Sequence, residues 1–363
     1  MDCDEVLDLE YGAWSKALRK KAAAQRIPLS GTIELTFRCN LRCVHCYLDG
    51  QHTPAPDQQE LTTEEVKGII DQIVDAGCLW LLLTGGDPLV RPDWKEIYLY
   101  AKRKGLILTL FTNGTLLTPD DADFLAKWRP YVVEISLYGA SAETYERITG
   151  IPGSYEKCIR GIDLLVERGV PLRLKTMLMT LNQHELVAMR ELAEGFELKF
   201  NFDPILRPSA DGDLFPYQYR LDVDDIVLLE RIHSPEKLEH WSSQIHEQRH
   251  NTSRRTDLYQ CDAGRTSFSI DPYGDLGLCT LSRERSYNLR EGSFRRGWDS
   301  FIGPLRATPC PDALDCVDCE LRMICQQCPA LSKLEYGSFE TSSAYLCRLT
   351  HRRAQEMAAS ALI

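Results

Sequence analysis

The chain has 363 residues, of which 44% are hydrophobic and 26% are charged, as in a folded globular protein with one large core and a smaller module. It carries 53 acidic and 42 basic side chains, a net charge of -11, without a long Lys/Arg run, so a nucleic-acid partner is not expected. The first residues, Met1 to Glu5, are acidic where a signal peptide is basic, and no apolar stretch has the length of a membrane span. We therefore expect a cytoplasmic protein with no membrane partner.

Strand-like and helix-like patterns alternate along the first 204 residues. Residues 1–30 predict a helical lead-in, and residues 31–204 predict a six-stranded α/β domain. The strand-like runs are 33–37, 79–83, 106–111, 132–137, 172–178 and 198–202. The helical segments lie near 62–76, 92–104, 118–127, 154–168 and 183–194, with Thr62, Thr118 and Asn182 as candidate N-caps. This alternation predicts a parallel sheet with its helices outside, either an open doubly wound sheet or a partial barrel.

The rest of the chain has a different character. Residues 205–260 are less periodic and predict a bridge with one helix over 223–232. Residues 261–350 predict a module of short strands, turns and cysteines, and a helical pattern over 348–361 leads us to assign 351–363 to a C-terminal helix. Fourteen cysteines in a cytosolic chain indicate metal or cluster ligands rather than disulfides, because that compartment keeps thiols reduced.

Cys39, Cys43 and Cys46 follow the first predicted strand at C-x3-C-x2-C spacing. Iron-sulfur clusters are normally held by four thiolates, so three ligands on a four-iron cluster leave one iron open for a substrate or cofactor. The alternative is a zinc knuckle, for which a fourth Cys or His ligand is expected nearby. His45 lies inside the loop, and we expect it to point elsewhere.

This loop, with the aromatic Tyr47 directly after Cys46, resembles the signature of the radical S-adenosylmethionine superfamily. The resemblance implies a [4Fe-4S] cluster bound by the three cysteines, with its open iron chelated by the amino and carboxylate groups of S-adenosylmethionine. It also selects a partial (β/α)6 TIM-like barrel, in which functional residues gather at the carboxyl ends of the strands.

The segment Gly85, Gly86, Asp87 and Pro88 follows the second predicted strand and taken alone predicts a turn. At a strand end it resembles the G-G-E-P element of the same superfamily, with Asp for Glu, which implies that it holds the methionine amino group.

Three further residues are similar to the family pattern after the third and fourth strands. By that resemblance Asn113 and Ser136 face ribose or carboxylate oxygens, and Arg147 is a candidate partner of the methionine carboxylate. The alternative for Arg147 is a solvated arginine at a helix end. Many relatives have Asp where this chain has Tyr138.

Seven cysteines in the C-terminal module resemble the SPASM extension of peptide-modifying and protein-modifying members of the superfamily. The resemblance implies two auxiliary iron-sulfur clusters, one held by Cys261, Cys279 and Cys328 and the other by Cys316, Cys319, Cys325 and Cys347. Cys325 and Cys328 are spaced C-x2-C where many members have C-x3-C. Cys310 either completes the first cluster or has no such role, and a zinc ribbon over 316–328 is the alternative.

The resemblance implies a radical S-adenosylmethionine oxidoreductase with a cysteine-rich auxiliary-cluster domain. Its 5'-deoxyadenosyl radical would abstract hydrogen from a peptide or protein side chain, leading to cross-linking, epimerisation or oxidation. Asp203 and Arg207 follow the sixth predicted strand, where barrel sites are built, and are our candidates for substrate contact; a loop salt bridge is the alternative.

About 30 residues precede the barrel, too few for a fused leader-peptide recognition domain, so a separate recognition protein is expected. An electron donor such as flavodoxin or ferredoxin is expected as well. The alternatives are a radical enzyme of cofactor or tetrapyrrole biosynthesis and a non-catalytic iron-sulfur carrier. The glycine element argues against the carrier, which has no need to bind S-adenosylmethionine.

Overall fold

The structure is a computed structural model that describes residues 11–48, 59–248, 255–312, 314 and 316–360. A nine-stranded sheet forms its centre, in the order β6-β5-β4-β3-β2-β1-β7-β8-β9. The first six strands are parallel and follow the chain order: β1 (Ser30–Thr36), β2 (Trp80–Gly85), β3 (Ile107–Thr112), β4 (Val132–Ser136), β5 (Leu172–Met177) and β6 (Lys199–Asp203). All six match strands predicted from the sequence, and their arrangement confirms the partial (β/α)6 barrel.

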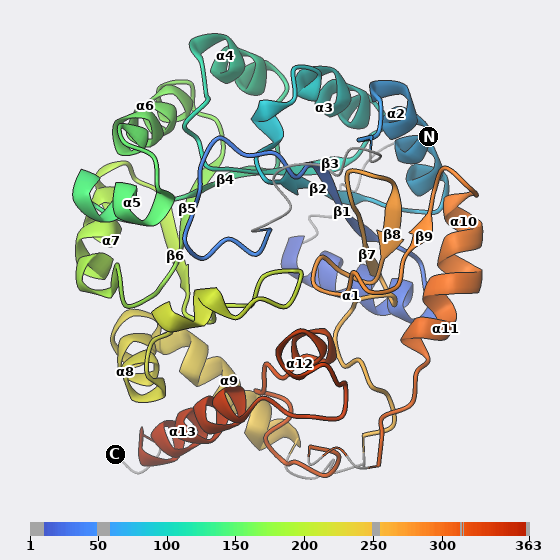
Figure 1. The fold of residues 1–363 in the computed structure, drawn as a ribbon, viewed down its shortest axis with the longest axis vertical. Helices are drawn as coiled ribbons and strands as arrows, with labels where there is room; N and C mark the ends of the chain where they lie inside the picture. The colour runs from blue at the N-terminus through green and yellow to red at the C-terminus, as the bar shows by residue number, and fades with distance from the viewer. Residues whose placement is uncertain (1–10, 49–58, 249–254, 313, 315, 361–363) are drawn as a thin grey trace, which may run out of the picture.

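Helices cover the outside of these strands (Figure 1). They are α2 (Thr63–Asp75), α3 (Trp94–Arg103), α4 (Pro119–Lys127), α5 (Ala142–Thr149), α6 (Ser154–Glu167) and α7 (Leu186–Gly195). Thr62 and Thr118 begin α2 and α4 with capping boxes, as predicted, and each such cap contributes about 1 kcal/mol. Helix α5 was not predicted; it begins at the N-cap Ser141 and ends at Gly150, which adopts the left-handed conformation.

Asn182 does not cap α7, contrary to the prediction. Its side-chain oxygen accepts from Met179 N at 2.9 Å, while its amide donates to the carbonyls of Tyr138 and Met177 at 3.1 Å. The completely buried Asn182 thus satisfies its own amide by joining the loops after β4 and β5.

Alternation of buried and partly exposed residues along β3 and β5 contributes to the barrel core. In β3 the buried Leu108 and Leu110 pack in the main hydrophobic core, whereas Phe111 lines an interior cavity. Cys78 and Cys158 are buried in the same core, as expected of small apolar side chains.

The cysteine-rich region extends the barrel sheet. Strand β7 (Ser267–Ile270) pairs in parallel with β1, and β8 (Asp275–Gly277) and β9 (Tyr287–Asn288) follow as antiparallel strands. A Cβ atom on Gly31 would lie 2.4 Å from the Phe268 ring, so glycine is required where β1 and β7 meet. The predicted domain boundary at residue 261 therefore does not separate two sheets.

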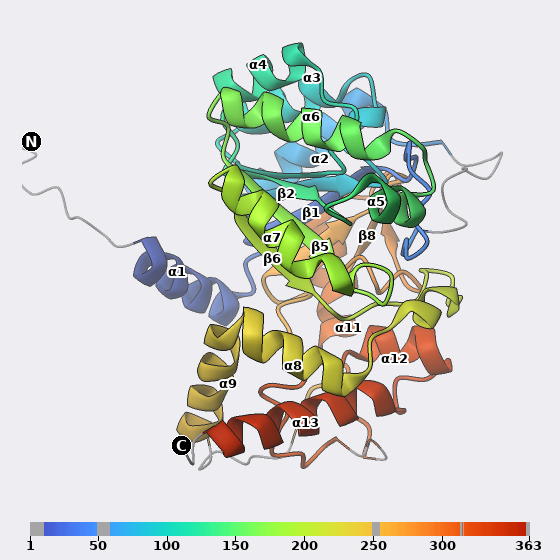
Figure 2. The same cartoon turned by 90° about the vertical axis from the view of Figure 1, so that its left-hand side faces the viewer.

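The remaining helices are α1 (Tyr11–Gln25), α8 (Val223–His233), α9 (Pro235–Gln248), α10 (Phe294–Arg296), α11 (Gly303–Arg306), α12 (Pro329–Tyr336) and α13 (Ala344–Ser360). Helix α1 lies in the predicted lead-in, whose residues 1–10 are outside the described residues. Helix α9 was not predicted, and α13 begins before the predicted boundary at 351. Helices α8 and α13 lie side by side below the barrel in Figure 2, joined by a buried ion pair between Glu230 and Arg353.

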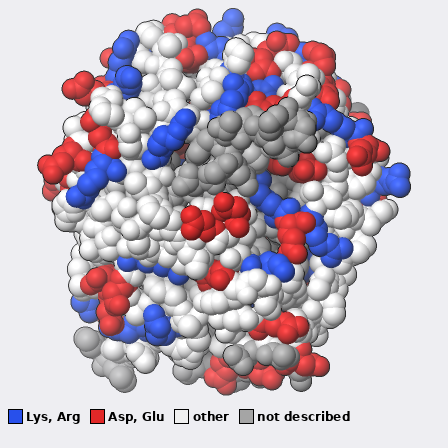
Figure 3. Space-filling view, in the orientation of Figure 1, with Lys and Arg blue, Asp and Glu red and all other residues white. Residues whose placement is uncertain are grey.

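The surface seen in Figure 3 carries acidic and basic side chains intermingled around a central hollow. Within the described residues no helix is both long enough and apolar enough to cross a membrane.

Candidate active site

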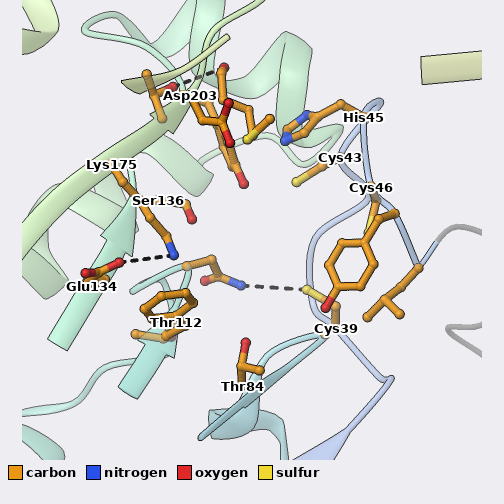
Figure 4. Close-up of a pocket in the computed structure, with 18 of the residues that line it drawn as sticks. Cys39, Cys43, His45, Cys46, Thr84, Thr112, Glu134, Ser136, Lys175 and Asp203 are labelled. Atoms are coloured by element: carbon orange, nitrogen blue, oxygen red, sulfur yellow. Dashed lines mark hydrogen bonds and ion pairs between the residues drawn. The ribbon is translucent and has the colours of Figure 1, made fainter. Parts of the chain in front are cut away.

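A cavity of about 560 Å³ opens at the carboxyl ends of the barrel strands, within the range of small-molecule sites. Cys39, Cys43 and Cys46 lie on one wall, and side chains from β4, β5 and β6 face them from the other (Figure 4). Tyr47, Gly85, Gly86, Asn113 and Ser136 also line the cavity. The structure thus brings together most of the residues that the resemblance assigns to S-adenosylmethionine.

The glycine pair allows the end of β2 to cross the entry to the cysteine loop. A Cβ atom on Gly85, whose φ is +135°, would lie 2.1 Å from the Thr36 carbonyl oxygen, and one on Gly86 would lie 2.3 Å from that of Arg38. Gly86 N donates to Thr36 O at 2.8 Å, and Asp87 N donates to Arg38 O at 3.0 Å. A larger residue at either glycine would displace the segment that leads into Cys39.

Asp87 is completely buried and does not line the cavity, and neither does Pro88. The Asp87 carboxylate accepts hydrogen bonds from Leu89 N at 2.9 Å and from Thr112 Oγ1 and Asn113 N, both at 2.8 Å. Burial raises the pKa of this carboxyl, and the three donors oppose the shift. The Asp for Glu shortening therefore gives a side chain that joins the ends of β2 and β3, and its contact with S-adenosylmethionine stays a prediction.

The donor set of the loop fits an iron-sulfur cluster. Cys39 Sγ accepts from Leu41 N at 3.4 Å and from Asn113 Nδ2 at 3.7 Å, contacts that favour a thiolate. Burial is the main reason that the pKa of the Cys39 and Cys43 thiols is raised, and the neighbouring thiols add to the effect at Cys43. Because only thiolates ligate iron, cluster binding must release these protons.

The unpredicted helix α5 supports the loop from behind. Arg42 N donates to Thr149 O at 2.8 Å, and Val44 N donates to Ile148 O at 3.0 Å. Arg147 on this helix donates to Leu181 O at 2.8 Å and is not among the residues that line the cavity. Its guanidinium would have to leave this contact to reach a carboxylate in the cavity, so its proposed role stays a prediction.

His45 lines the cavity, and the expectation that it points elsewhere is wrong. Its neighbour Val44 packs into a small apolar cluster around Ile148, which directs the next side chain to the opposite side. The His45 ring packs edge-on against the Tyr138 ring, with 4.7 Å between the ring centroids. The Nδ1 atom of His45 has no hydrogen-bond partner among the described residues. Burial lowers its pKa to about 4, so the ring is neutral.

The wall opposite the loop carries charged side chains that the sequence analysis did not single out. Lys175 Nζ lies 3.3 Å from Glu134 Oε2 and 2.9 Å from the centroid of the Phe111 ring. Burial lowers its pKa to about 8, although Glu134 opposes the shift. The available signal was the pair Arg173 and Lys175, which alternates with the buried Leu172 and Leu174 along β5. Asp203 and Arg207 also line the cavity, with 3.9 Å between Asp203 Oδ2 and Arg207 Nη2.

Seven of the eight cysteines of the C-terminal region fall into two groups of neighbouring thiols. Burial, with the nearby thiols of Cys328 and Cys261, raises the pKa of Cys279 to about 11. Burial also raises the pKa of Cys316, and Cys325, Cys319 and Cys347 add to it. Cys310 is not among the thiols that most raise the pKa of Cys279 or of Cys316. Among the described residues, no three His, Cys, Asp or Glu side chains are already gathered around a position for a single metal ion.

The first of these groups borders the cavity. Thr280 and Leu281, directly after Cys279, are part of the cavity wall. Arg207, on the same wall, is close enough to Cys328 that its charge lowers the pKa of that thiol, although burial raises it by more.

Residues 33–193 match the Radical SAM superfamily. An AdoMet-dependent heme synthase of Methanosarcina barkeri (strain Fusaro / DSM 804) is 29% identical over 331 residues, which are 86% of this chain and 94% of the relative. The mycofactocin maturase MftC of Mycobacterium tuberculosis (strain CDC 1551 / Oshkosh) is 30% identical over 75% of this chain and 70% of the relative.

The fold is also similar to that of Streptococcus suis SuiB bound to its precursor peptide SuiA. The TM-score is 0.70 at 18% identity, over 96% of this chain and 84% of that one, and at this identity the likeness concerns the fold alone. The sequence matches contain the cysteine loop and the glycine pair that face each other in the cavity. The chain therefore belongs to the radical S-adenosylmethionine superfamily, whose members are enzymes that bind a [4Fe-4S] cluster and S-adenosylmethionine.

Proposed function

We propose that this enzyme modifies a peptide or protein side chain by hydrogen abstraction in the barrel cavity. The observation that carries the proposal is that the three-thiol loop, the glycine pair beside it and a charged wall opposite the loop line one cavity. When bound, the cluster supplies the electron that cleaves S-adenosylmethionine into methionine and a 5'-deoxyadenosyl radical, which then takes a hydrogen atom from the substrate.

The residues around the cavity have separate roles in this proposal. Cys39, Cys43 and Cys46 hold the cluster, while the close backbone approach at Gly85 and Gly86 leaves room for S-adenosylmethionine beside it. Asn113 and Ser136 offer polar groups to the same ligand. A substrate that fills the cavity would exclude water, which protects a radical from quenching.

The charged wall is our candidate for substrate binding. Arg173, Lys175 and Arg207 outnumber the carboxylates Glu134 and Asp203 among the residues that line the cavity. Their ion pairs within the wall are long: Arg173 and Lys175 lie 4.0 and 3.3 Å from Glu134, and Arg207 lies 3.9 Å from Asp203. Such loosely paired cations favour a substrate that carries a carboxylate near the reacting carbon.

The two C-terminal cysteine groups are our candidates for auxiliary clusters, one at Cys261, Cys279 and Cys328 and the other at Cys316, Cys319, Cys325 and Cys347. A substrate radical that ends as an oxidised product must lose one electron and one proton. The first group borders the cavity, so the electron has a short path to it. An oxidative outcome is therefore proposed over a redox-neutral one.

A peptide substrate is supported by the maturase relative and by the fold shared with a peptide-bound enzyme. In this proposal a separate protein recognises the peptide, and flavodoxin or ferredoxin donates electrons in the cytoplasm. The heme synthase relative, aligned over 94% of its length, favours a second candidate, a tetrapyrrole with carboxylate side chains.

A deuterium-transfer assay tests the proposal. The full chain, reconstituted without oxygen, is incubated with S-adenosylmethionine and dithionite, together with either deuterated peptides encoded near its gene or a deuterated porphyrin. Deuterium in 5'-deoxyadenosine with the peptide alone supports the proposal, and deuterium with the porphyrin alone supports the second candidate. The control is the triple variant Cys39→Ala, Cys43→Ala, Cys46→Ala. If the parent protein forms no more 5'-deoxyadenosine than this control, the carrier function is favoured instead.

A further inference from the structure

We infer that Arg283, from the cysteine-rich region, is a positioning residue that holds both ends of the three-cysteine loop through Glu34, Tyr47 and Phe37. The inference rests on the proposed function, since it concerns the cluster that this loop would carry. It makes the geometry of the radical-forming site dependent on a residue that lies four positions after Cys279 in the chain.

Glu34 is the centre of this contact set. It lies in β1, has none of its surface exposed, and accepts from Arg283 Nη2 at 2.8 and 2.7 Å. The Tyr47 hydroxyl donates to the same carboxylate at 2.9 Å. Because Tyr47 directly follows Cys46, this chain of bonds fixes the end of the cysteine loop to Arg283.

Phe37 connects Arg283 to the beginning of the loop. The Arg283 guanidinium lies 4.9 Å from the centroid of the Phe37 ring, two residues before Cys39. Tyr273, also from the cysteine-rich region, contacts Phe37 as well, with 5.6 Å between the centroids of the two rings. Both ends of the loop are therefore packed against residues that lie beyond position 261.

The chemistry of Glu34 makes Arg283 difficult to replace. Burial raises the pKa of the Glu34 carboxyl, and the charge and hydrogen bonds of Arg283 oppose this shift. Without Arg283, a buried carboxylate would keep the Tyr47 hydroxyl as its donor and would take up a proton or draw in water. Either change moves Tyr47 and, with it, Cys46.

Arg283 also lies close to the other parts of the site. Thr280 and Leu281, which line the cavity, connect it to Cys279. One short segment thus contains an auxiliary ligand candidate, two cavity residues and the residue that holds the loop. A disturbance of this segment would reach the radical-forming cluster without any change in its ligands.

Arg283→Met and Arg283→Lys, made in the full reconstituted chain, test the inference. The matched control is Arg290→Met, which also breaks an Arg–Glu pair between the cysteine-rich region and the barrel, with Arg290 2.7 and 3.1 Å from Glu65 at the start of α2. The readouts are iron content, the melting temperature, the change in the electron paramagnetic resonance spectrum on adding S-adenosylmethionine, and the rate of 5'-deoxyadenosine formation without substrate.

Arg283→Met is expected to weaken the spectral change and to slow 5'-deoxyadenosine formation roughly ten- to a hundredfold, as the loss of a residue that orients metal ligands does. Arg283→Lys should recover part of the loss, and Arg290→Met should keep the parent rate. A parent-like spectrum and rate in Arg283→Met overturns the inference, as does an equal loss in Arg290→Met.

Tyr47→Phe keeps the Arg283–Glu34 pair and covers the case in which Arg283→Met does not fold. It should bind the parent amount of iron yet show an altered spectrum, and an unchanged spectrum would overturn the inference. Failure of the proposed function gives a different result, because the parent protein itself would then form no 5'-deoxyadenosine.

Discussion

Lys175 shows how a single side chain acquires its properties from its surroundings. It extends from β5 over the Phe111 ring into the cavity, and its ammonium has Glu134 as its nearest carboxylate at 3.3 Å. Burial disfavours the charged form, which places the pKa of this lysine at about 8. Its charge therefore changes within a range of pH in which most enzymes remain folded.

The charge of Lys175 should be lost as the pH rises through about 8. Acetylation with isotope-coded acetic anhydride, read by mass spectrometry, is expected to reach half of its limiting rate at Lys175 near that pH. The sign for stability follows from linkage: the unfolded chain holds this proton at higher pH than the folded chain, so stability rises between pH 8 and the ordinary lysine range. A labelling midpoint above pH 10 would contradict the assignment.

Asp203 gives a second prediction for a single residue. If it contacts the substrate, Asp203→Asn should cleave S-adenosylmethionine at the parent rate while product formation falls, because the loop and the glycine pair are untouched. Chromatography of 5'-deoxyadenosine and of product from one reaction separates the two. A full product yield from the variant would contradict substrate contact and would favour the alternative, a salt bridge between Asp203 and Arg207.

At the level of elements, the cysteine loop is held by two neighbours. The end of β2 crosses the backbone that enters the loop. Carbonyl groups at the end of α5 accept hydrogen bonds from the backbone N–H groups of Arg42 and Val44 in the loop. These contacts hold the loop through its backbone rather than through the cysteine side chains, which are the candidate ligands. The glycines at this crossing are required by the space between two backbones.

Gly86→Ala is expected to lower the iron retained at the loop and to reduce S-adenosylmethionine cleavage at least tenfold, since a displacement of about 1 Å can cost a hundredfold. The reason is the Cβ atom, which would lie 2.3 Å from Arg38 O. Gly68→Ala is the control, because nothing lies within 4 Å of its Cβ position inside α2. This control should gain about 1 kcal/mol of stability from helix propensity, and equal losses in both variants would contradict the explanation.

At the scale of the whole molecule, one sheet connects the barrel with the cysteine-rich region. Strand β7 pairs with β1, so the sheet of the cysteine-rich region continues from the strand that leads into the cysteine loop. The division of labour proposed here assigns radical formation to the barrel and electron acceptance to the C-terminal region. Reconstituted protein is then expected to contain about twelve irons per chain if three four-iron clusters form.

Cys316→Ala with Cys319→Ala tests this division. These thiols belong to the second cysteine group, whereas the loop contacts of Arg283 lie beside the first. Formation of 5'-deoxyadenosine should persist while product formation collapses, because the electron that the first group takes from the substrate radical then has no onward path through the second group. Circular dichroism must first show that the barrel survives. Product at the parent rate from a folded variant would assign the group a structural role.

Local patterns predicted the elements that depend on neighbours in the chain. Thr62 and Thr118 were identified as caps because capping is decided within four residues. Helix α5 was missed because it is short, and the role of Asn182 was missed because its partners include Tyr138, 44 residues away. His45 was misplaced because its direction depends on where Val44 packs.

The sequence by itself determined the alternating strands and helices and the C-x3-C-x2-C spacing of the cysteine loop, since periodicity and spacing are local properties. The tertiary structure decided which side chains face the cavity and what holds the loop. Lys175 meets Glu134 across neighbouring strands, and Glu34 meets Arg283 across 249 positions of the chain. Contacts of that separation follow from the pairing of β1 with β7 and from packing, which local sequence patterns do not encode.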